Sequence, residues 1–265
     1  MSYQQFRPNS FKVLPPVVKN LLIINGLMFL ATVVFQERLA INLTQLLGLH
    51  LPMASDFRPY QIITYMFMHG SLTHVFFNMF ALWMFGNTLE NYWGPKRFLV
   101  YYIVTGIGAA ICHYIVIYYQ IAPILIPIDN FLQNPSIETL EMFAASQNQL
   151  LPSQFNSQEL IQNTLDQLTV DREHFLNRHI MVGASGSVFG ILLAFGMLFP
   201  NTLLYVYFAI PVKAKWFVLF YGIAELYAGI ANNPGDNIAH FAHLGGMLFG
   251  FVLIKVWNKN RSNFY

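Results

Sequence analysis

Six long apolar segments follow one another along the chain, and they constrain its fold more than any other feature. Each approaches the roughly 20 apolar residues that an α-helix needs to cross a bilayer. Only 10% of the residues are charged, whereas soluble domains carry about 25%. The sequence therefore predicts an all-α, polytopic membrane protein with six transmembrane helices. The predicted spans are residues 17–35, 70–90, 97–120, 181–199, 214–231 and 238–257.

The distribution of charge predicts the orientation of these spans. With the N-terminus inside, ten of the fourteen basic residues fall on inner segments and ten of the twelve acidic residues on outer ones. Lysine and arginine are enriched on the cytoplasmic side of membranes. We therefore expect a cytoplasmic segment at 1–16, a membrane domain at 17–257 and a basic cytoplasmic tail at 258–265. The first apolar run is longer than a signal-peptide core, which predicts a retained span. A bacterial cytoplasmic membrane is the expected location, with an organelle membrane as the alternative.

The outer segment 121–180, between spans three and four, differs in composition from the rest of the chain. It is rich in Gln, Asn, Glu and Asp. Within it, PSIETLEMFAAS and SQELIQNTLDQLTVDREHFL place apolar residues at steps of three and four, and each begins with a plausible helix cap. This pattern predicts a helical hairpin outside the membrane, with a mobile loop as the alternative. The apolar segment near 200–213 contains a proline and a lysine, and is expected to form an interfacial bend.

Three of the predicted spans begin with polar side chains, which are costly within a bilayer and usually functional. These spans run in the same direction, from outside to inside. Their polar residues therefore lie at the same depth, near the outer face, and are expected to form one site. They are His69, His74 and Asn78 on span two, Ser185 and Ser187 on span four, and His240 and His243 on span six.

These residue types suit nucleophilic catalysis. A serine hydroxyl becomes a nucleophile when a base, usually histidine, takes its proton, and the resulting anion needs hydrogen-bond donors. His74 and Asn78 are four residues apart, so on a helix they share one face. Small residues would let spans four and six approach closely enough for a contact between serine and histidine. The glycines concerned are Gly183, Gly186, Gly190, Gly246 and Gly250.

The ordered motifs resemble those of a known family. HGSLTHVFFN on span two, GASG on span four and A-H-x-x-H-L-G-G-x-x-x-G on span six are similar to the motifs of the rhomboid intramembrane serine proteases. ENYWGPKRF, after span two, resembles the family's loop between spans two and three. The resemblance covers about residues 17–257, apart from the insertion at 121–180.

The resemblance implies a catalytic dyad in which Ser185 is the nucleophile and His243 the general base. No acidic third member is expected, because no Asp or Glu is predicted at that depth near either residue. Glu225 lies inside span five with no obvious partner. Glu90 is expected to form a structural pair near the inner end of its span, with a basic residue as the candidate partner.

The resemblance also implies supporting roles around the serine. His74, Asn78 and the backbone N–H of Ser185 would stabilise the oxyanion, and Gly183 would leave room beside the nucleophile. Phe189 stands where the family commonly has a tyrosine, and would stack on the catalytic histidine without the hydroxyl group.

Two further histidines are candidates for the site. His69 is explained equally well by a hydrogen bond at the start of span two. His240 is a competing base, and a structural role at the outer rim explains it as well.

The leading hypothesis is a serine protease that cleaves transmembrane segments of other membrane proteins near the outer face. We expect the lipid bilayer and membrane-protein substrates as partners, no nucleic acid, no cofactor and no metal. The alternative is a catalytically inactive rhomboid-like binder of transmembrane helices, with a chaperone or trafficking role. A histidine-rich metal site or transporter is a third option. It is disfavoured because no H-E-x-x-H motif occurs and no carboxylate is expected beside the histidines.

Overall fold

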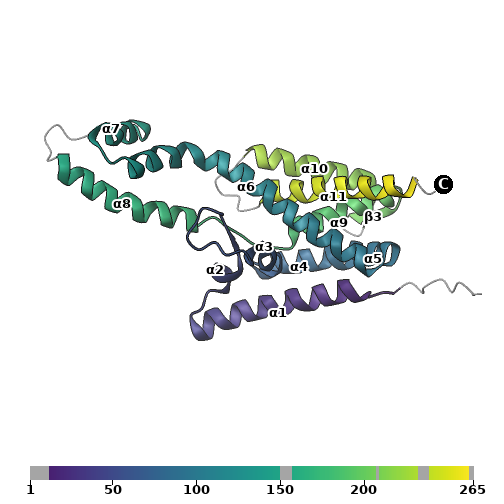
Figure 1. Ribbon diagram of the computed structural model, residues 1–265. Coiled ribbons are helices and arrows are strands. Elements are labelled where there is room, and N and C mark those ends of the chain that lie inside the picture. The colour runs from purple at the N-terminus through teal and green to yellow at the C-terminus, as the bar shows by residue number, and fades with distance from the viewer. Residues whose placement is uncertain (1–11, 150–156, 207–208, 232–238, 263–265) are drawn as a thin grey trace, which may run out of the picture.

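The chain folds into a bundle of helices with a helical extension at one end (Figure 1). The computed structural model describes residues 12–149, 157–206, 209–231 and 239–262. The elements are α1 (Pro16–Leu39), α2 (Leu43–Leu47), β1 (Leu49–His50), α3 (Gln61–Thr64), η1 (Tyr65–Phe67), α4 (Leu72–Ala81), η2 (Leu82–Gly86), α5 (Asn87–Trp93), α6 (Pro95–Gln133), α7 (Ile137–Ser146), α8 (Ser157–Asn177), β2 (Ile180–Met181), α9 (Ser185–Leu198), β3 (Leu203–Val206), β4 (Ile210–Lys213), α10 (Ala214–Ala231) and α11 (His240–Ser262).

Among the described residues, four helices are long and apolar enough to cross a membrane: α1, α6, α10 and residues 240–259 of α11. The apolar helix α9 is shorter, with 14 residues. The elements α4, η2 and α5 follow one another without a break, and η2 is a single π-helical stretch. The predicted class, an all-α polytopic membrane protein, is confirmed, whereas the number of spans stays a prediction. Residues 1–11 of the predicted N-terminal segment and 263–265 of the predicted tail lie outside the described residues.

Helices α6, α9 and α11 form the centre of the bundle. A Cβ atom added to Gly246 of α11 would lie 1.9 Å from the carbonyl oxygen of Gly186 on α9, so these two backbones touch. This confirms the predicted close approach of spans four and six. Gly190 and Gly250 instead pack against α6, where added Cβ atoms would meet Thr105 and Tyr101.

The first turn of α1 is capped by a distant carboxylate. Oε1 and Oε2 of Glu90 accept hydrogen bonds from the backbone N–H groups of Val17 (2.9 Å) and Val18 (2.8 Å). The first amides of a helix have no intrahelical acceptor, so Glu90 satisfies two of them and ties α5 to α1. Glu90 therefore has the structural role that the sequence suggested, but its partner is the backbone and not a basic residue.

The extension is built from the end of α6 together with α7 and α8 (Figure 1). Helix α6 continues through Pro123 and Pro127 to Gln133, well past the predicted end of span three at residue 120. Ser136 forms a capping box at the start of α7, as its position in the sequence suggested. The two predicted helices are confirmed, and their connection at 150–156 lies outside the described residues.

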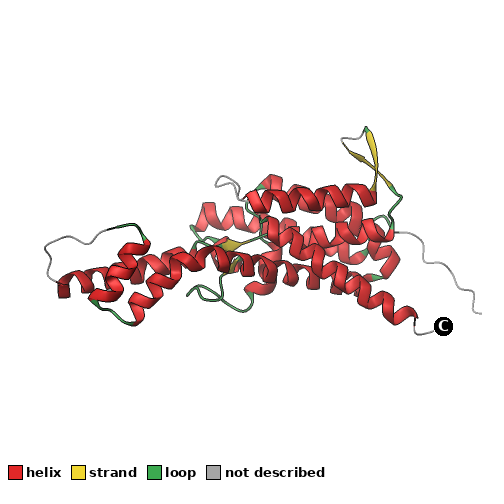
Figure 2. Ribbon diagram, turned by 90° about the horizontal axis from the view of Figure 1, so that it is seen from above, coloured by secondary structure: helices red, strands yellow, loops and turns green. Residues whose placement is uncertain are grey.

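The apolar segment that follows α9 does not form the simple bend that was predicted. It forms the antiparallel pair β3–β4, with Leu203 opposite Lys213 and Val206 opposite Ile210. Figure 2 shows this hairpin projecting from the bundle at the end opposite to the extension. A second pair, β1–β2, joins residues 49–50 to 180–181 directly before the GASG motif.

Candidate active site

Ser185 is the first residue of α9 and is half-buried. The chain enters α9 through β2 and then through Gly183, whose N–H donates to the carbonyl oxygen of Tyr65 at 2.9 Å. These contacts fix the backbone directly before the serine. Because the first amides of a helix have no intrahelical acceptor, the N–H of Ser185 is available to an oxygen placed beside the hydroxyl group.

Gly183 brings the serine and a histidine of another helix together. Its φ angle is +120°, a conformation that favours glycine. A Cβ atom added there would lie 2.8 Å from both Cε1 and Nε2 of His74 and 3.6 Å from Oγ of Ser185. The imidazole of His74 and the hydroxyl of Ser185 therefore lie beside the same side of this glycine, between α4 and α9.

Asn78 and His69 flank His74. Asn78 lies one turn further along α4, is 6% exposed, and its Nδ2 has no hydrogen-bond partner among the described residues. An unpaired buried donor is costly, and such a donor can serve a developing oxyanion. His69 is buried, and its ring contacts the ring of His74 edge-on, with the centroids 4.9 Å apart. The ring contact of His69 is thus with His74.

His243 lies in the first turn of α11 and is held by an aromatic ring of α9. Its imidazole stacks on Phe189 with the ring centroids 4.0 Å apart and the planes 5° from parallel. Phe189 is one helical turn beyond Ser185, so the stack brings the imidazole to the part of α9 that carries the serine. The ring of Tyr221, on α10, also stacks on Phe189, at 5.1 Å. Tyr221 belongs to none of the motifs described in the sequence.

A carboxylate joins this site, and the expectation that no acidic residue lies near His243 is wrong. Oε2 of Glu225, on α10, accepts hydrogen bonds from Nδ1 of His243 at 2.8 Å and from Nδ1 of His240 at 2.7 Å. Glu225 is 7% exposed. His240, which is half-buried, therefore shares this carboxylate with His243, and Glu225 has the partners that the sequence did not reveal.

A signal for Glu225 was present in the sequence. It lies six residues before the end of α10, about 9 Å along a helix axis. His243 lies three residues after the start of α11, about 5 Å along its axis. Because α10 and α11 are consecutive and run in opposite directions, the two residues lie at similar depths. Glu225 in span five therefore lies near the depth of the polar residue His243 in span six.

Within the described part of the chain, no hydrogen bond joins Ser185 to His243. Their helices touch at Gly186 and Gly246, one residue after the serine and three after the histidine. Catalytic hydrogen bonds are often long in a free enzyme and shorten when substrate binds. With Nδ1 of His243 engaged by Glu225, Nε2 is the nitrogen that remains to accept a proton.

The ligand atoms of Glu225, His240 and His243 lie within 4.8 Å of one another, so these three residues could hold a metal ion. Ligands around a tetrahedral zinc ion, at about 2.0–2.2 Å from it, stand roughly 3.3 Å from each other. The observed separations of 2.7 and 2.8 Å are hydrogen-bond lengths. Shared protons explain this geometry better than a metal ion does. The absence of a resident metal stays a prediction.

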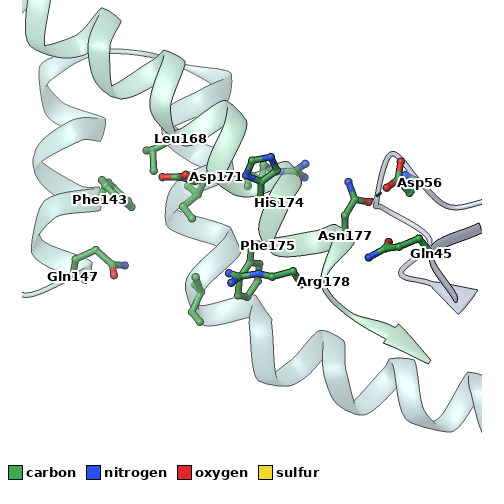
Figure 3. A pocket seen from close by; sticks show the side chains of 13 residues that line it. Gln45, Asp56, Phe143, Gln147, Leu168, Asp171, His174, Phe175, Asn177 and Arg178 are labelled. Atoms are coloured by element: carbon green, nitrogen blue, oxygen red, sulfur yellow. Dashed lines mark hydrogen bonds between the residues drawn. The ribbon is translucent and has the colours of Figure 1, made fainter. Parts of the chain in front are cut away.

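A separate pocket of about 730 Å³ lies between the extension and the loops below it. Figure 3 shows Phe143 of α7 and Gln147, directly after α7, on one side, Phe175 and Arg178 of the α8 region in the middle, and Asp56 across from them. The lining includes none of the residues predicted for catalysis.

A protein-family model matches the elements that carry these residues. The Rhomboid domain model matches residues 56–123 and 158–259, which is more than half of the chain and includes His69, His74, Asn78, Ser185, Phe189, Glu225, His240 and His243. The chain belongs to the rhomboid family. The match omits residues 124–157, which include the end of α6 and the whole of α7. This part of the extension therefore lies outside the residues that the Rhomboid domain model matches.

Three rhomboid relatives are mitochondrial by name. The chain is 25% identical over 248 residues to RHOMBOID-like protein 12, mitochondrial, of Arabidopsis thaliana, covering 94% of this chain and 60% of that protein. It is 26% identical over 207 residues to Rhomboid protein 1, mitochondrial, of Saccharomyces cerevisiae, covering 76% and 44%. It is 36% identical over 88 residues to an uncharacterized mitochondrial rhomboid protein of Schizosaccharomyces pombe, covering 31% and 22%. The chain thus spans at most 60% of the length of these relatives. They do not support the expected bacterial location.

Proposed function

We propose that this rhomboid-family protein is an intramembrane serine protease that cleaves transmembrane segments of other membrane proteins. The observation that carries the proposal is the arrangement around Gly183 and Phe189. His74 and Ser185 meet beside Gly183, and the imidazole of His243 stacks on Phe189 one turn further along α9. Packing alone gives no reason for a hydroxyl group, two imidazoles and an unpaired amide donor to gather at one end of an apolar bundle.

In the proposed reaction, Nε2 of His243 removes the proton of the Ser185 hydroxyl as Oγ attacks a peptide carbonyl. The tetrahedral oxyanion accepts hydrogen bonds from Nδ2 of Asn78, the imidazole of His74 and the N–H of Ser185. His243 then gives its proton to the leaving amine, which breaks the peptide bond and leaves an acyl-enzyme. Attack by water, with His243 again as the base, releases the second product and restores the serine.

The cleaved bond is proposed to lie near the outer face of the membrane. His74, Ser185 and His243 lie near the starts of α4, α9 and α11, and the charge distribution of the sequence assigns these helix ends to the outer side. On the same grounds both termini lie on the inner side. Placement in a bacterial cytoplasmic membrane stays a prediction that the mitochondrial relatives do not support.

The test is cleavage of a generic transmembrane substrate by purified protein in liposomes. Wild type is compared with Ser185→Ala and His243→Ala, and melting temperatures show whether the variants fold. We expect cleavage by wild type and loss of at least 10³-fold in both variants. Labelling by a fluorophosphonate probe is expected in wild type and absent in Ser185→Ala. Folded wild-type protein that neither cleaves nor takes up the probe would support the inactive binder of transmembrane helices instead.

A further inference from the structure

Glu225 is the only acidic residue of α10 and is placed among apolar side chains. It is 7% exposed. A buried carboxylate is costly unless other groups donate hydrogen bonds to it. In the described structure its donors are the Nδ1 atoms of His240 and His243, both on its Oε2. These two histidines are three residues apart on α11, so a single helix face holds the carboxylate.

The hydrogen bond determines which nitrogen of His243 can act as a base. An ionised carboxylate only accepts hydrogen bonds, so Nδ1 of His243 must carry the proton. In a neutral imidazole the lone pair is then on Nε2. A base for Ser185 needs a free lone pair, and Glu225 therefore selects the competent tautomer.

The same carboxylate is suited to the charge that develops during the reaction. When Nε2 of His243 takes the proton of Ser185, an imidazolium forms with its Nδ1 2.8 Å from Oε2 of Glu225. The attraction between opposite charges is strong where water is largely excluded. The stacked ring of Phe189 can fix the plane of the imidazole, but it offers no negative charge and no hydrogen-bond acceptor of this strength.

We propose that Glu225 is a positioning residue for His243, so that Ser185, His243 and Glu225 act as a triad and not as a dyad. This inference rests on the protease function proposed above. It differs from what the family resemblance implies, because the resemblance supplies no acidic member. His240 takes part indirectly: as the second donor to Oε2, it holds the carboxylate in place.

The rival explanation is that Glu225 only joins α10 to α11. Two substitutions separate the explanations. Glu225→Gln keeps the length of the side chain and can still bridge the helices, but removes the charge. Glu225→Asp keeps the charge but is one methylene shorter. Glu90→Gln is the matched control, because it also neutralises a buried carboxylate that accepts two hydrogen bonds, at the start of α1.

The measurements are kcat and KM for cleavage of the transmembrane substrate, the rate of fluorophosphonate labelling, and the melting temperature. For Glu225→Gln we expect kcat and the labelling rate to fall by about 10²- to 10⁴-fold with little change in KM. Glu225→Asp should retain more activity than Glu225→Gln, since the carboxylate can still select the tautomer. Glu90→Gln should keep kcat near the wild-type value even where its melting temperature falls.

A Glu225→Gln variant with wild-type kcat, or with more activity than Glu225→Asp, would overturn the triad. If Ser185→Ala abolishes cleavage while Glu225→Gln does not, the triad fails and the protease survives. Wild-type protein that neither cleaves nor labels overturns both. If Glu225→Gln does not fold, ¹⁵N NMR of histidine-labelled wild type decides, with the His243 signal assigned from its loss in His243→Ala. A neutral His243 protonated on Nδ1 supports the triad, and protonation on Nε2 overturns it.

Discussion

Gly183→Ala tests the geometry of the site most directly, because a single methyl group there disturbs both the backbone and the proposed oxyanion donor. The φ angle of +120° is one that residues with a side chain rarely adopt. Forcing alanine into it costs about 1–3 kcal/mol. The added Cβ would lie 2.8 Å from two atoms of the His74 ring, where ordinary contact begins at 3.4 Å. The ring must therefore move by about 0.6 Å or more.

The expected effect on catalysis follows from the displaced ring. Removing one oxyanion donor typically lowers kcat by about 10²- to 10³-fold, so we expect Gly183→Ala to lower kcat by about 10²-fold. In a His74→Ala background the methyl group no longer meets the ring, and the same substitution should lower kcat by less than about tenfold. The two effects are then non-additive, as expected for residues in contact.

The assay is a double-mutant cycle on kcat for substrate cleavage, with melting temperatures for each variant. Gly26→Ala serves as the control, because an added Cβ there meets nothing within 4 Å. Wild-type kcat in Gly183→Ala would show that the contact with His74 has no catalytic consequence. Additive effects of the two substitutions would show that Gly183 acts by some route other than the imidazole.

Three further substitutions test other contacts. Glu90→Gln removes the charged acceptor of two backbone N–H groups at the start of α1, and should destabilise the bundle by about 1.5–3 kcal/mol in thermal unfolding. Gly246→Ala places a methyl group 1.9 Å from the carbonyl oxygen of Gly186; a loss of about 1–3 kcal/mol or more is expected, against no loss for Gly26→Ala in the same melting assay. Phe189→Ala removes the ring stacked on the imidazole of α11. Such stacks are worth about 0.5–1.5 kcal/mol, so kcat should fall by roughly three- to tenfold in initial-rate measurements.

Where the polarity of the chain changes sharply, the sequence predicted the helices well. Helix α10 has the predicted bounds of span five, 214–231, because the basic residue Lys213 precedes it and polar residues follow it. Helix α7 begins after the predicted cap, since the Ser136 hydroxyl accepts a hydrogen bond from the free backbone N–H of Thr139 in its first turn. In both cases the information is local, and a single sequence contains it.

Elements that depend on contacts with distant segments were predicted less well. The predicted span three ends at residue 120, but α6 continues to Gln133 because the apolar side chains of its last turns pack against residues of the extension. Ile121, Leu125 and Ile128 follow steps of three and four and are all buried. That spacing indicated a longer helix in spite of Pro123 and Pro127. The β3–β4 hairpin was missed because its apolar run shows no clear alternation.

The site was predicted in part because direction and depth follow from the spans alone. Ser185, His74 and His243 were grouped without any contact information, and the structure places them at neighbouring helix starts. Glu225 was missed for a physical reason: its partners come from the next helix, and no local pattern marks a hydrogen bond across two helices. An acidic residue within a span has to find such a partner, so it was itself a signal that a donor lay close by.

The aromatic ring and the carboxylate restrict different motions of His243. Stacking on Phe189, with the planes 5° from parallel, fixes the plane of the imidazole but leaves rotation within that plane almost free. The hydrogen bond from Nδ1 to Glu225 fixes that rotation, and with it the direction of Nε2. The family commonly has tyrosine at position 189, and this chain lacks the hydroxyl group. If Glu225 sets the rotation of the His243 imidazole, the flat phenyl ring of Phe189 needs only to fix the plane of that imidazole. The absence of a hydroxyl group at position 189 is then compatible with an ordered base.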